Sequence, residues 1–452
     1  MAPLFAFPLA ILLIAPPPIA PDSEILKILQ QRIDQYHWGV GMVVGVIEPG
    51  GNRRLVAYGK LDQNDPRTLN GDTVFEIGSI TKVFTSLLLA DAVQQGEVAF
   101  DDPISKYLPE DVSTPERKGR SITLADLSSH TSGLPQVFGN PDSQDEDNPY
   151  TGYTVQQLYN FISNFQLRRD IGSKFEYSNM GAGLLGHLLA RRAATAYETL
   201  IEARITGPLG LKDTRITLTP EMNERRAVGH GPSLRAVAPW DMPTLSAAGA
   251  LRSTTNDMLN FLAAELGYTR TPLASAMASM LEKRVPVGDP RGTEVGLGWF
   301  VYKRNGKEIV EHGGDTTGFQ SAIAFDRQNG SGVVVLSNSS SAFHQVADIA
   351  MHLLNPDYSL ERPAPVETEI DPPAFDRHVG KYELQSEPKL VLTFTREDNR
   401  FFIQAAGQDK LELFAENEND FFLKVTDAQI TFESGGLILH QNGFDERGNR
   451  IE

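Results

Sequence analysis

Two residues three positions apart, Ser79 and Lys82 in FEIGSITKVFTSLLLA (residues 75–90), could act as a nucleophile and its base. The apolar pattern around them predicts a buried helix that begins near Ser79 and closes at Gly96. Side chains three positions apart share one helix face, so the Lys82 amine can reach the Ser79 hydroxyl. Serine needs a base, and a lysine in a tight site can lose its proton near neutral pH. The alternative is a serine that caps the helix, followed by a solvated lysine. A second Ser-x-x-Lys, Ser386 to Lys389, lies beside a proline and is assigned no role.

A second candidate group is Tyr177-Ser178-Asn179, which stands just before an apolar helix pattern. A tyrosine can exchange a proton with an attacking or leaving group if cationic neighbours lower its pKa. Asn179 offers a donor and an acceptor, which suit a substrate amide and could also fix the lysine. The alternative is a helix start with no chemistry.

The third group is His312-Gly313-Gly314, on or just after a predicted strand in VEHGGDTTGF. Two glycines let a ligand lie against the strand edge, and the backbone N–H groups beyond them can bind an oxyanion. His37-Trp38-Gly39 has the same spacing but lacks the second glycine. Taken alone, His312 would be a structural residue.

Composition narrows the function classes. The chain has 452 residues, a net charge of -17 and no cysteine. This charge argues against nucleic acid as a partner and disfavours docking on an anionic membrane. The absence of cysteine excludes disulfides, a thiol nucleophile and cysteine-ligated metals. A small molecule or a peptide is the expected substrate, and the oligomeric state stays open.

The N-terminus reads as an export signal. Residues 1–21 carry no charged side chain, and an apolar run spans Leu4 to Ala15. We expect a signal peptide over residues 1–20 and a periplasmic or secreted protein. No Lys or Arg precedes the run, so an uncleaved anchor or a misplaced start codon are the alternatives. No later segment is long and apolar enough to span a membrane.

Strand patterns open and close the first 355 residues, with helix patterns between them. This order predicts one sheet built from both ends of the chain and carrying a helical insertion. A proline-rich linker over residues 358–373 follows. Residues 374–452 alternate between apolar and polar side chains with short turns, which predicts a small antiparallel barrel or sandwich.

The three groups in this order resemble the penicillin-recognising serine hydrolases of the class C β-lactamase type. LSSHTSGLP (127–135) and SAAGALRSTTNDMLNFL (246–262) are similar to the same family, so the resemblance covers roughly residues 30–355. It implies an α/β fold over residues 22–357, with an antiparallel sheet flanked by helices and a helical domain. Residues 374–452 resemble the lipocalin-like domain that some members carry.

The resemblance also implies roles. Ser79 would be the acylated nucleophile, Lys82 its base or proton partner, and Tyr177 the general acid and base. Asn179 would orient the substrate, the N–H groups of Ser79 and Asp315 would bind the oxyanion, and His312 and Gly314 would line the substrate site. No metal or cofactor is implied. LSSHTSGLP is expected to be structural.

One departure bears on the substrate. Class C β-lactamases carry Lys-Thr-Gly where this chain has His312-Gly313-Gly314. The His-x-Gly form is similar to that of family peptidases, D-aminopeptidases and esterases. Histidine would supply a cation there only below its ordinary pKa of ~6.5. We therefore expect a serine hydrolase that cleaves peptide, amide or ester bonds in D-amino-acid or peptidoglycan-type peptides. A β-lactamase is one alternative, and a catalytically silent penicillin-binding or sensor protein is another.

Overall fold

The central element is an antiparallel sheet, seen here in a computed structural model that describes residues 19–136, 148, 150–289, 291–340, 345–385, 389–426, 428–441 and 443–452. Within these residues its nine strands follow the spatial order β3 (Asp65–Thr68), β2 (Arg53–Asp62), β1 (Gly41–Ile47), β13 (Ser331–Ser337), β12 (Gln320–Asp326), β11 (Lys307–Asp315), β10 (Phe300–Arg304), β9 (Glu294–Val295) and β8 (Val285–Pro286). Strand β1 pairs with β13, so the two ends of this part of the chain meet in one sheet. The prediction of a sheet built from both ends is confirmed.

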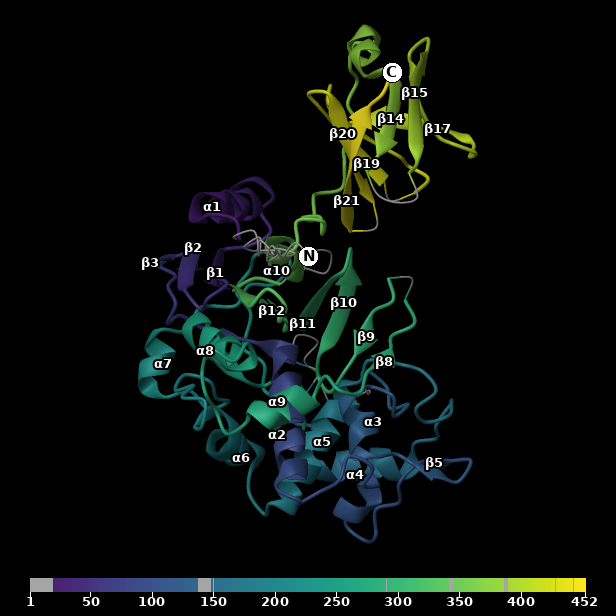
Figure 1. Ribbon diagram of the computed structural model, residues 1–452. Helices are drawn as coiled ribbons and strands as arrows, with labels where there is room; N and C mark the ends of the chain where they lie inside the picture. The colour runs from purple at the N-terminus through teal and green to yellow at the C-terminus, as the bar shows by residue number, and fades with distance from the viewer. Residues whose placement is uncertain are drawn as a thin grey trace, which may run out of the picture.

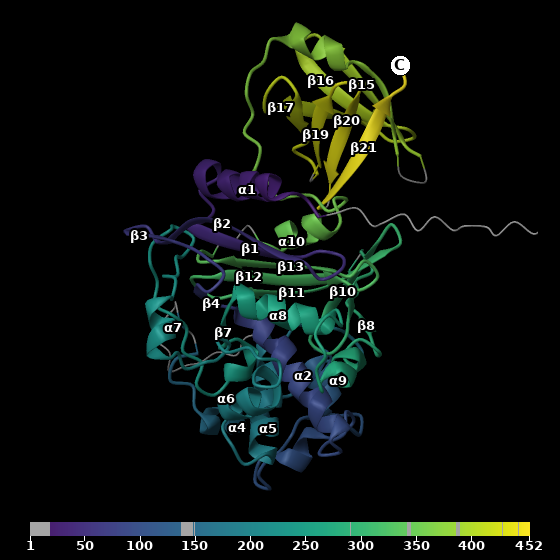
Figure 2. The ribbon, with the colours of Figure 1, turned by 60° about the vertical axis from the view of Figure 1, so that its left-hand side comes forward.

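Helices cover both faces of this sheet (Figure 1, Figure 2). On one face lie α1 (Asp22–Gln30) and α10 (Ala347–Leu354), which pack on the sheet through an aliphatic cluster that includes Ile25, Leu29, Val44 and Ile349. On the other face α8 (Thr255–Glu265) packs against β1 and β13, and the helical part lies beyond it. The helix expected after Asp22 continues past α1 as one turn of π-helix, Gln31–Gln35.

The helical part surrounds α2 (Thr81–Gln94), in which nearly every residue is buried. A helix that is apolar on all sides belongs inside a protein, which explains the absence of an amphipathic pattern in this segment. Around α2 and the edge of the sheet lie α3 (Leu124–Ser128), α4 (Val155–Asn164), α5 (Asn179–Arg192), α6 (Tyr197–Ile201), α7 (Pro220–Glu224) and α9 (Ala274–Ser279). Two short ribbons pair β4 (Val74–Glu76) with β7 (Arg252–Thr254) and β5 (Glu116–Arg117) with β6 (Arg120–Ser121).

The C-terminal strands form a closed barrel, so of the two predicted alternatives the barrel is correct. Its strands are β14 (Gly380–Leu384), β15 (Val391–Glu397), β16 (Arg400–Ala405), β17 (Lys410–Ala415), β18 (Asp420–Phe422), β19 (Ala428–Glu433), β20 (Gly436–Gln441) and β21 (Phe444–Arg450). Its own core is a cluster of aromatic and aliphatic side chains that includes Phe375, Phe394, Phe421 and Phe432. The barrel interior is therefore occupied by side chains.

The segment that joins the sheet-bearing part to the barrel keeps its contacts with the sheet-bearing part beyond Asp357. Tyr358 and Leu360 pack against the aliphatic cluster of α10 and the sheet, and the Glu361 backbone N–H donates to Asp348 at 2.6 Å. On the barrel side, the Phe444 ring lies 3.5 Å below the Arg304 guanidinium and beside Tyr358. Residues 358–361, at the start of the expected linker, thus contact both the sheet-bearing part and the barrel, and the domain bounds stay a prediction.

The predicted signal peptide lies outside the described residues, except at its last two positions. None of the described helices combines the length and the hydropathy that crossing a membrane requires.

These contacts predict how the chain tolerates shortening. A chain that ends at Arg362 should stay folded without the barrel, because the two hydrophobic clusters are separate. A chain that ends at Asp357 should lose about 2–3 kcal/mol of unfolding free energy, since it lacks Tyr358 and Leu360. Urea denaturation of the two chains measures this difference. Aggregation of both would mean that barrel and sheet depend on one another.

Candidate active site

Ser79 lies on a sharp turn between β4 and α2. Gly78–Ile80 forms a single 3-10 turn, and α2 begins only at Thr81, two residues later than the sequence suggested. Gly78 has a φ of +47°, and a Cβ there would lie 2.7 Å from the backbone N of Asp315. Only glycine fits this conformation and this contact. The turn holds Ser79 half-buried in front of β11.

Lys82 meets the Ser79 hydroxyl as predicted. Its Nζ lies 2.8 Å from Ser79 Oγ and 2.6 Å from the carbonyl oxygen of Ala248, and the side chain is 2% exposed. Burial lowers the pKa of Lys82 to about 7, and the nearby Asp315 opposes that shift. A neutral amine there can donate to Ala248 and accept the serine proton.

Tyr177 precedes α5 and faces the same pair. Lys82 Nζ lies 4.9 Å from the centre of its ring. The condition named for Tyr177, a pKa lowered by cationic neighbours, is not met: burial raises this pKa, and the hydrogen bond with Ser79 opposes the rise only in part. Tyr177 therefore keeps its proton at neutral pH. In this arrangement Lys82 can accept a proton near neutral pH, and Tyr177 can donate one.

His130, in the LSSHTSGLP segment, holds Tyr177 in place. Its ring lies against the Tyr177 ring with centroids 4.6 Å apart and a tilt of 31°, and its Nδ1 accepts from the Ser178 backbone N–H at 3.1 Å. The His130 carbonyl accepts from the Glu176 backbone N–H at 2.8 Å. Burial lowers the pKa of His130 well below its ordinary value, so the ring is neutral and can accept. The segment is structural, as expected, but it supports a residue of the site.

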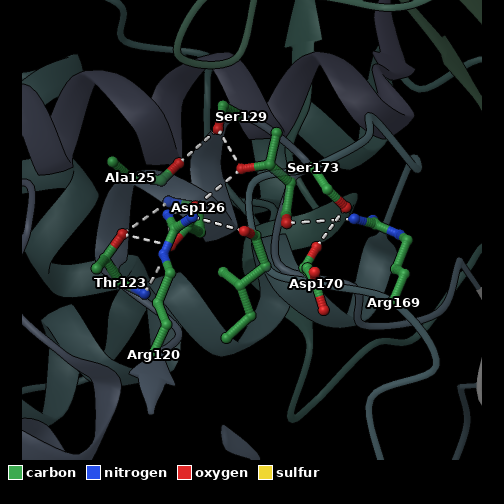
Figure 3. A network of polar contacts seen from close by, with 10 residues as sticks. Arg120, Thr123, Ala125, Asp126, Ser129, Arg169, Asp170 and Ser173 are labelled. Carbon is green, nitrogen blue, oxygen red and sulfur yellow. Dashed lines mark hydrogen bonds and ion pairs between the residues drawn. The ribbon is translucent and has the colours of Figure 1, made fainter. Parts of the chain in front are cut away.

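A polar network fixes the backbone around His130 (Figure 3). Asp126 accepts from Arg120, Thr123 and Thr131, and Thr123 caps α3. Arg120 also reaches the Ile171 carbonyl at 2.5 Å, which joins α3 to the chain leading to Tyr177. Asp126 thus holds the segment that carries His130, and Arg120 holds the segment that leads to Tyr177. Together they fix the two segments whose rings meet.

Asn179 lies at the start of α5 but does not hold the lysine. Its Nδ2 donates to Tyr150 Oη at 2.9 Å, whereas the hydrogen bonds of Lys82 run to Ser79 and Ala248. The described contacts therefore do not include one between Asn179 and Lys82. Among the described residues, the side-chain oxygen of Asn179 accepts no hydrogen bond.

Strand β11 completes the site. A Cβ on Gly314 would lie 2.1 Å from the Ile77 carbonyl oxygen and 2.9 Å from the Ser79 backbone N. This glycine is thus required by the nucleophile turn itself. The Thr316 N–H bonds across to Phe319, so the N–H of its neighbour Asp315 points away from β12. The N–H groups of Ser79 and Asp315 therefore belong to two segments in direct contact.

His312 lies on β11, and it is buried, with 2% of its surface exposed. Its Nδ1 lies 2.6 Å from the Gly313 carbonyl, and Nε2 has no hydrogen-bond partner among the described residues. Burial, together with the charge on Lys82, lowers the pKa of His312 to about 3. The expectation of a cation here in mildly acidic solution is therefore wrong. His312 offers a neutral acceptor at Nε2.

Residues 29–355 match the Beta-lactamase family. The chain belongs to this family. D-alanyl-D-alanine-carboxypeptidase/endopeptidase AmpH of Escherichia coli (strain K12) is 30% identical over 351 residues, which are 73% of this chain and 89% of that protein. Penicillin-binding protein 4* of Bacillus subtilis (strain 168) is 26% identical over 460 residues, or 94% of this chain and 98% of that protein. The latter match extends into the C-terminal barrel.

Solved structures agree with this assignment. The crystal structure of Beta-lactamase/D-alanine Carboxypeptidase from Yersinia pestis complexed with citrate matches with a TM-score of 0.63 at 26% identity, covering 74% of this chain and 96% of that one. The predicted fold class is confirmed, and this beta-lactamase-family chain is a serine hydrolase.

Several contacts at the site were not found from the sequence. Ala248 acts through its carbonyl, and Tyr150 and Trp240 form an edge-to-face pair, 5.2 Å apart, next to Asn179. Glu76 is buried three residues before Ser79. A backbone acceptor leaves no residue-type signal, whereas a carboxylate inside the apolar FEIG could have been singled out.

Lys82 should control both rate and pH dependence. We expect Lys82→Ala and Lys82→Arg each to lose ~10³-fold or more in kcat, because neither residue can accept the serine proton. In the wild type, kcat/KM should rise with pH through about 7, where the amine becomes neutral. Combined replacement of Ser79, Lys82 and Tyr177 should cost little more than one replacement. Exposed Lys212→Ala is the control, and near-normal turnover by Lys82→Ala would contradict the assignment.

His312 should contribute no titration between pH 5 and 9, since its pKa is lowered to about 3. The ratio of kcat/KM for a free-acid substrate to that for its methyl ester should then stay constant over this range. Steady-state kinetics on the pair, with NMR titration of the imidazole, measure this. A ratio that falls as pH rises through ~6.5 would show that the ring is protonated in solution.

Proposed function

We propose that this chain is an exported serine peptidase that cleaves its substrate through an acyl-enzyme at Ser79. The observation that carries the proposal is the 2.8 Å contact between Ser79 Oγ and a buried lysine whose pKa is lowered to about 7. This contact gives a weak nucleophile a base that is neutral under ordinary conditions.

The proposed proton path uses three residues. Lys82 takes the proton of Ser79 as Oγ bonds to the substrate carbonyl carbon. Tyr177 then donates its proton to the leaving nitrogen as the C–N bond breaks, and regains a proton from Lys82. A water molecule hydrolyses the ester by the reverse path. The raised pKa of Tyr177 suits a donor, because the phenol is protonated when the leaving group departs.

In this proposal the N–H groups of Ser79 and Asp315 bind the oxyanion, and Asn179 binds a substrate amide. The two N–H groups are on segments that touch at Gly78 and Gly314, which fixes their spacing before substrate arrives. No step requires a metal or a cofactor.

We place the substrate among D-amino-acid or peptidoglycan-type peptides, amides and esters. The names of the relatives, a D-alanyl-D-alanine-carboxypeptidase/endopeptidase and a penicillin-binding protein, favour this class. The neutral state of His312 favours a substrate whose portion beside β11 is uncharged, such as an internal peptide bond or an ester. β-lactam hydrolysis is the competing reaction.

Export is part of the proposal and rests on the uncharged apolar run at residues 1–21. The site would then act outside the cytoplasm, where peptidoglycan peptides occur.

The test is turnover of a small panel by wild type and by Ser79→Ala. The panel holds a D-Ala-D-Ala peptide, a D-alanine p-nitroanilide, a p-nitrophenyl ester and a chromogenic cephalosporin. We expect the wild type to cleave at least one of the first three, and to be labelled at Ser79 by fluorescent penicillin, as located by mass spectrometry. Ser79→Ala should lose both, while Ser279→Ala, on α9, should keep both. Turnover in Ser79→Ala would overturn the proposal, and fast cephalosporin hydrolysis alone would replace it with a β-lactamase.

A further inference from the structure

Glu76 is the last residue of β4, three positions before Ser79, and its side chain is 5% exposed. A carboxylate at such a position is costly unless its oxygens are satisfied. Its Oε1 accepts from Arg252 Nη2 at 3.0 Å and from the backbone N–H of Trp240 at 3.0 Å. Arg252 is the strand partner of Glu76 in the β4–β7 ribbon. The mechanism proposed above does not use this buried ion pair.

The contacts of Glu76 lead to the far side of the oxyanion site. Trp240, held at its N–H by Glu76, donates from its indole Nε1 to Thr317 Oγ1 at 2.7 Å. Arg252 also donates to the Trp240 carbonyl at 2.7 Å. Thr317 is two residues beyond Asp315. Glu76 is thus joined by its own backbone to Ser79 and through Trp240 to the end of β11.

Thr316 adds a second approach to the same carboxylate. Its buried hydroxyl has no hydrogen-bond partner among the described residues, yet it lies close to Glu76. Burial raises the pKa of Glu76, and Arg252 and Thr316 oppose that rise only in part. Thr316 directly follows Asp315. Thr316 therefore lies beside Glu76, and Thr317 is joined to Glu76 through Trp240.

The backbone of the turn at Gly78 and the backbone of β11 at Gly314 cannot move closer together. A Cβ on Gly78 would lie 2.7 Å from the Asp315 N, and one on Gly314 would lie 2.9 Å from the Ser79 N. The two segments are already as close as backbones can pack. A shift of β11 away from the turn is resisted by Ser321, the β12 partner of Gly314, whose Oγ donates to the Ile77 carbonyl at 2.9 Å. The contacts of Glu76 add a second restraint on the other side of the turn.

We propose that Glu76, with Arg252 and Trp240, is a positioning residue that sets the distance between the oxyanion-binding N–H groups of Ser79 and Asp315. This inference rests on the proposed function, because it assumes that both N–H groups bind the oxyanion. Glu76 touches no reacting atom and acts on the rate through the two backbone segments.

The test is Glu76→Gln, which keeps the shape and an acceptor for Trp240 but removes the charge that binds Arg252. We expect kcat to fall ~10–100-fold with KM changed less than ~3-fold, because displaced oxyanion donors weaken only the transition state. The dissociation constant of a boronic acid should rise by the same factor as kcat falls. This inhibitor bonds to Ser79 and places an oxygen between the two N–H groups.

The matched control is Glu265→Gln. Glu265 is also fully buried and also pairs with an arginine, Arg327 at 3.2 Å, but it lies at the end of α8. Both variants should lose thermal stability, and only Glu76→Gln should lose kcat and boronic acid affinity. Equal melting shifts with wild-type kcat and inhibitor affinity in both variants would overturn the inference.

If Glu76→Gln does not fold, a milder second variant tests the same restraint. Trp240→Phe retains the backbone contact with Glu76 and keeps an aromatic ring beside Tyr150, but it removes the indole N–H that donates to Thr317. It should lower kcat and boronic acid affinity together, by ~3–10-fold, and unchanged values would count against the restraint. Failure of the wild type to cleave any panel substrate or to bind the boronic acid would instead refute the proposed function.

Discussion

The site depends on one close contact, between the backbone of the turn at Gly78 and the backbone of β11 at Gly314. A side chain on either residue would collide with the other segment within 3 Å. The contact joins residues far apart in the chain, so it can form only because β1 and β13 close the sheet between them. The large antiparallel sheet is thus the device that brings Ser79, near the start of the chain, to the strand that carries Asp315. Glycine is therefore required at both positions by the packing of the two backbones, whatever either residue contributes to substrate binding.

Burial of α2 is the second requirement, and it explains the chemistry of Lys82. A lysine on the first turn of an exposed helix would keep its proton, whereas here desolvation disfavours the charged form and lowers the pKa to about 7. The same desolvation raises the pKa of Tyr177 and lowers those of His130 and His312. One physical cause therefore sets the proton states of four neighbouring groups: a base near neutrality, a protonated phenol and two neutral imidazoles.

How far the sequence predicts this site depends on whether a feature is local. The Ser79–Lys82 contact follows from spacing along one turn, and the strands and the barrel follow from apolar alternation, so these predictions hold. From the sequence alone, the proton states of Tyr177 and His312 stayed conditional, because their pKa values depend on how deeply the fold buries them. Glu76 and the carbonyl of Ala248 were missed because their partners, Trp240 and Lys82, lie far away in the chain. The start of α2 was misplaced by two residues because a tertiary contact at Gly78 imposes a 3-10 turn.

The histidine at position 312 is best understood together with Lys82. A lysine at 312 would place a second ammonium beside the first, and each charge would lower the pKa of the other. A neutral imidazole avoids this coupling, so desolvation is the main force that sets the pKa of Lys82, and Asp315 opposes it weakly. Asp315 is then the neighbouring group whose charge still shifts the pKa of Lys82, and it raises that pKa. A neutral His312 provides no fixed positive charge for an acidic substrate group. Its Nε2 is an acceptor with no partner among the described residues. Because Nε2 is itself buried, the consequence that the structure carries is the loss of a fixed positive charge at this position.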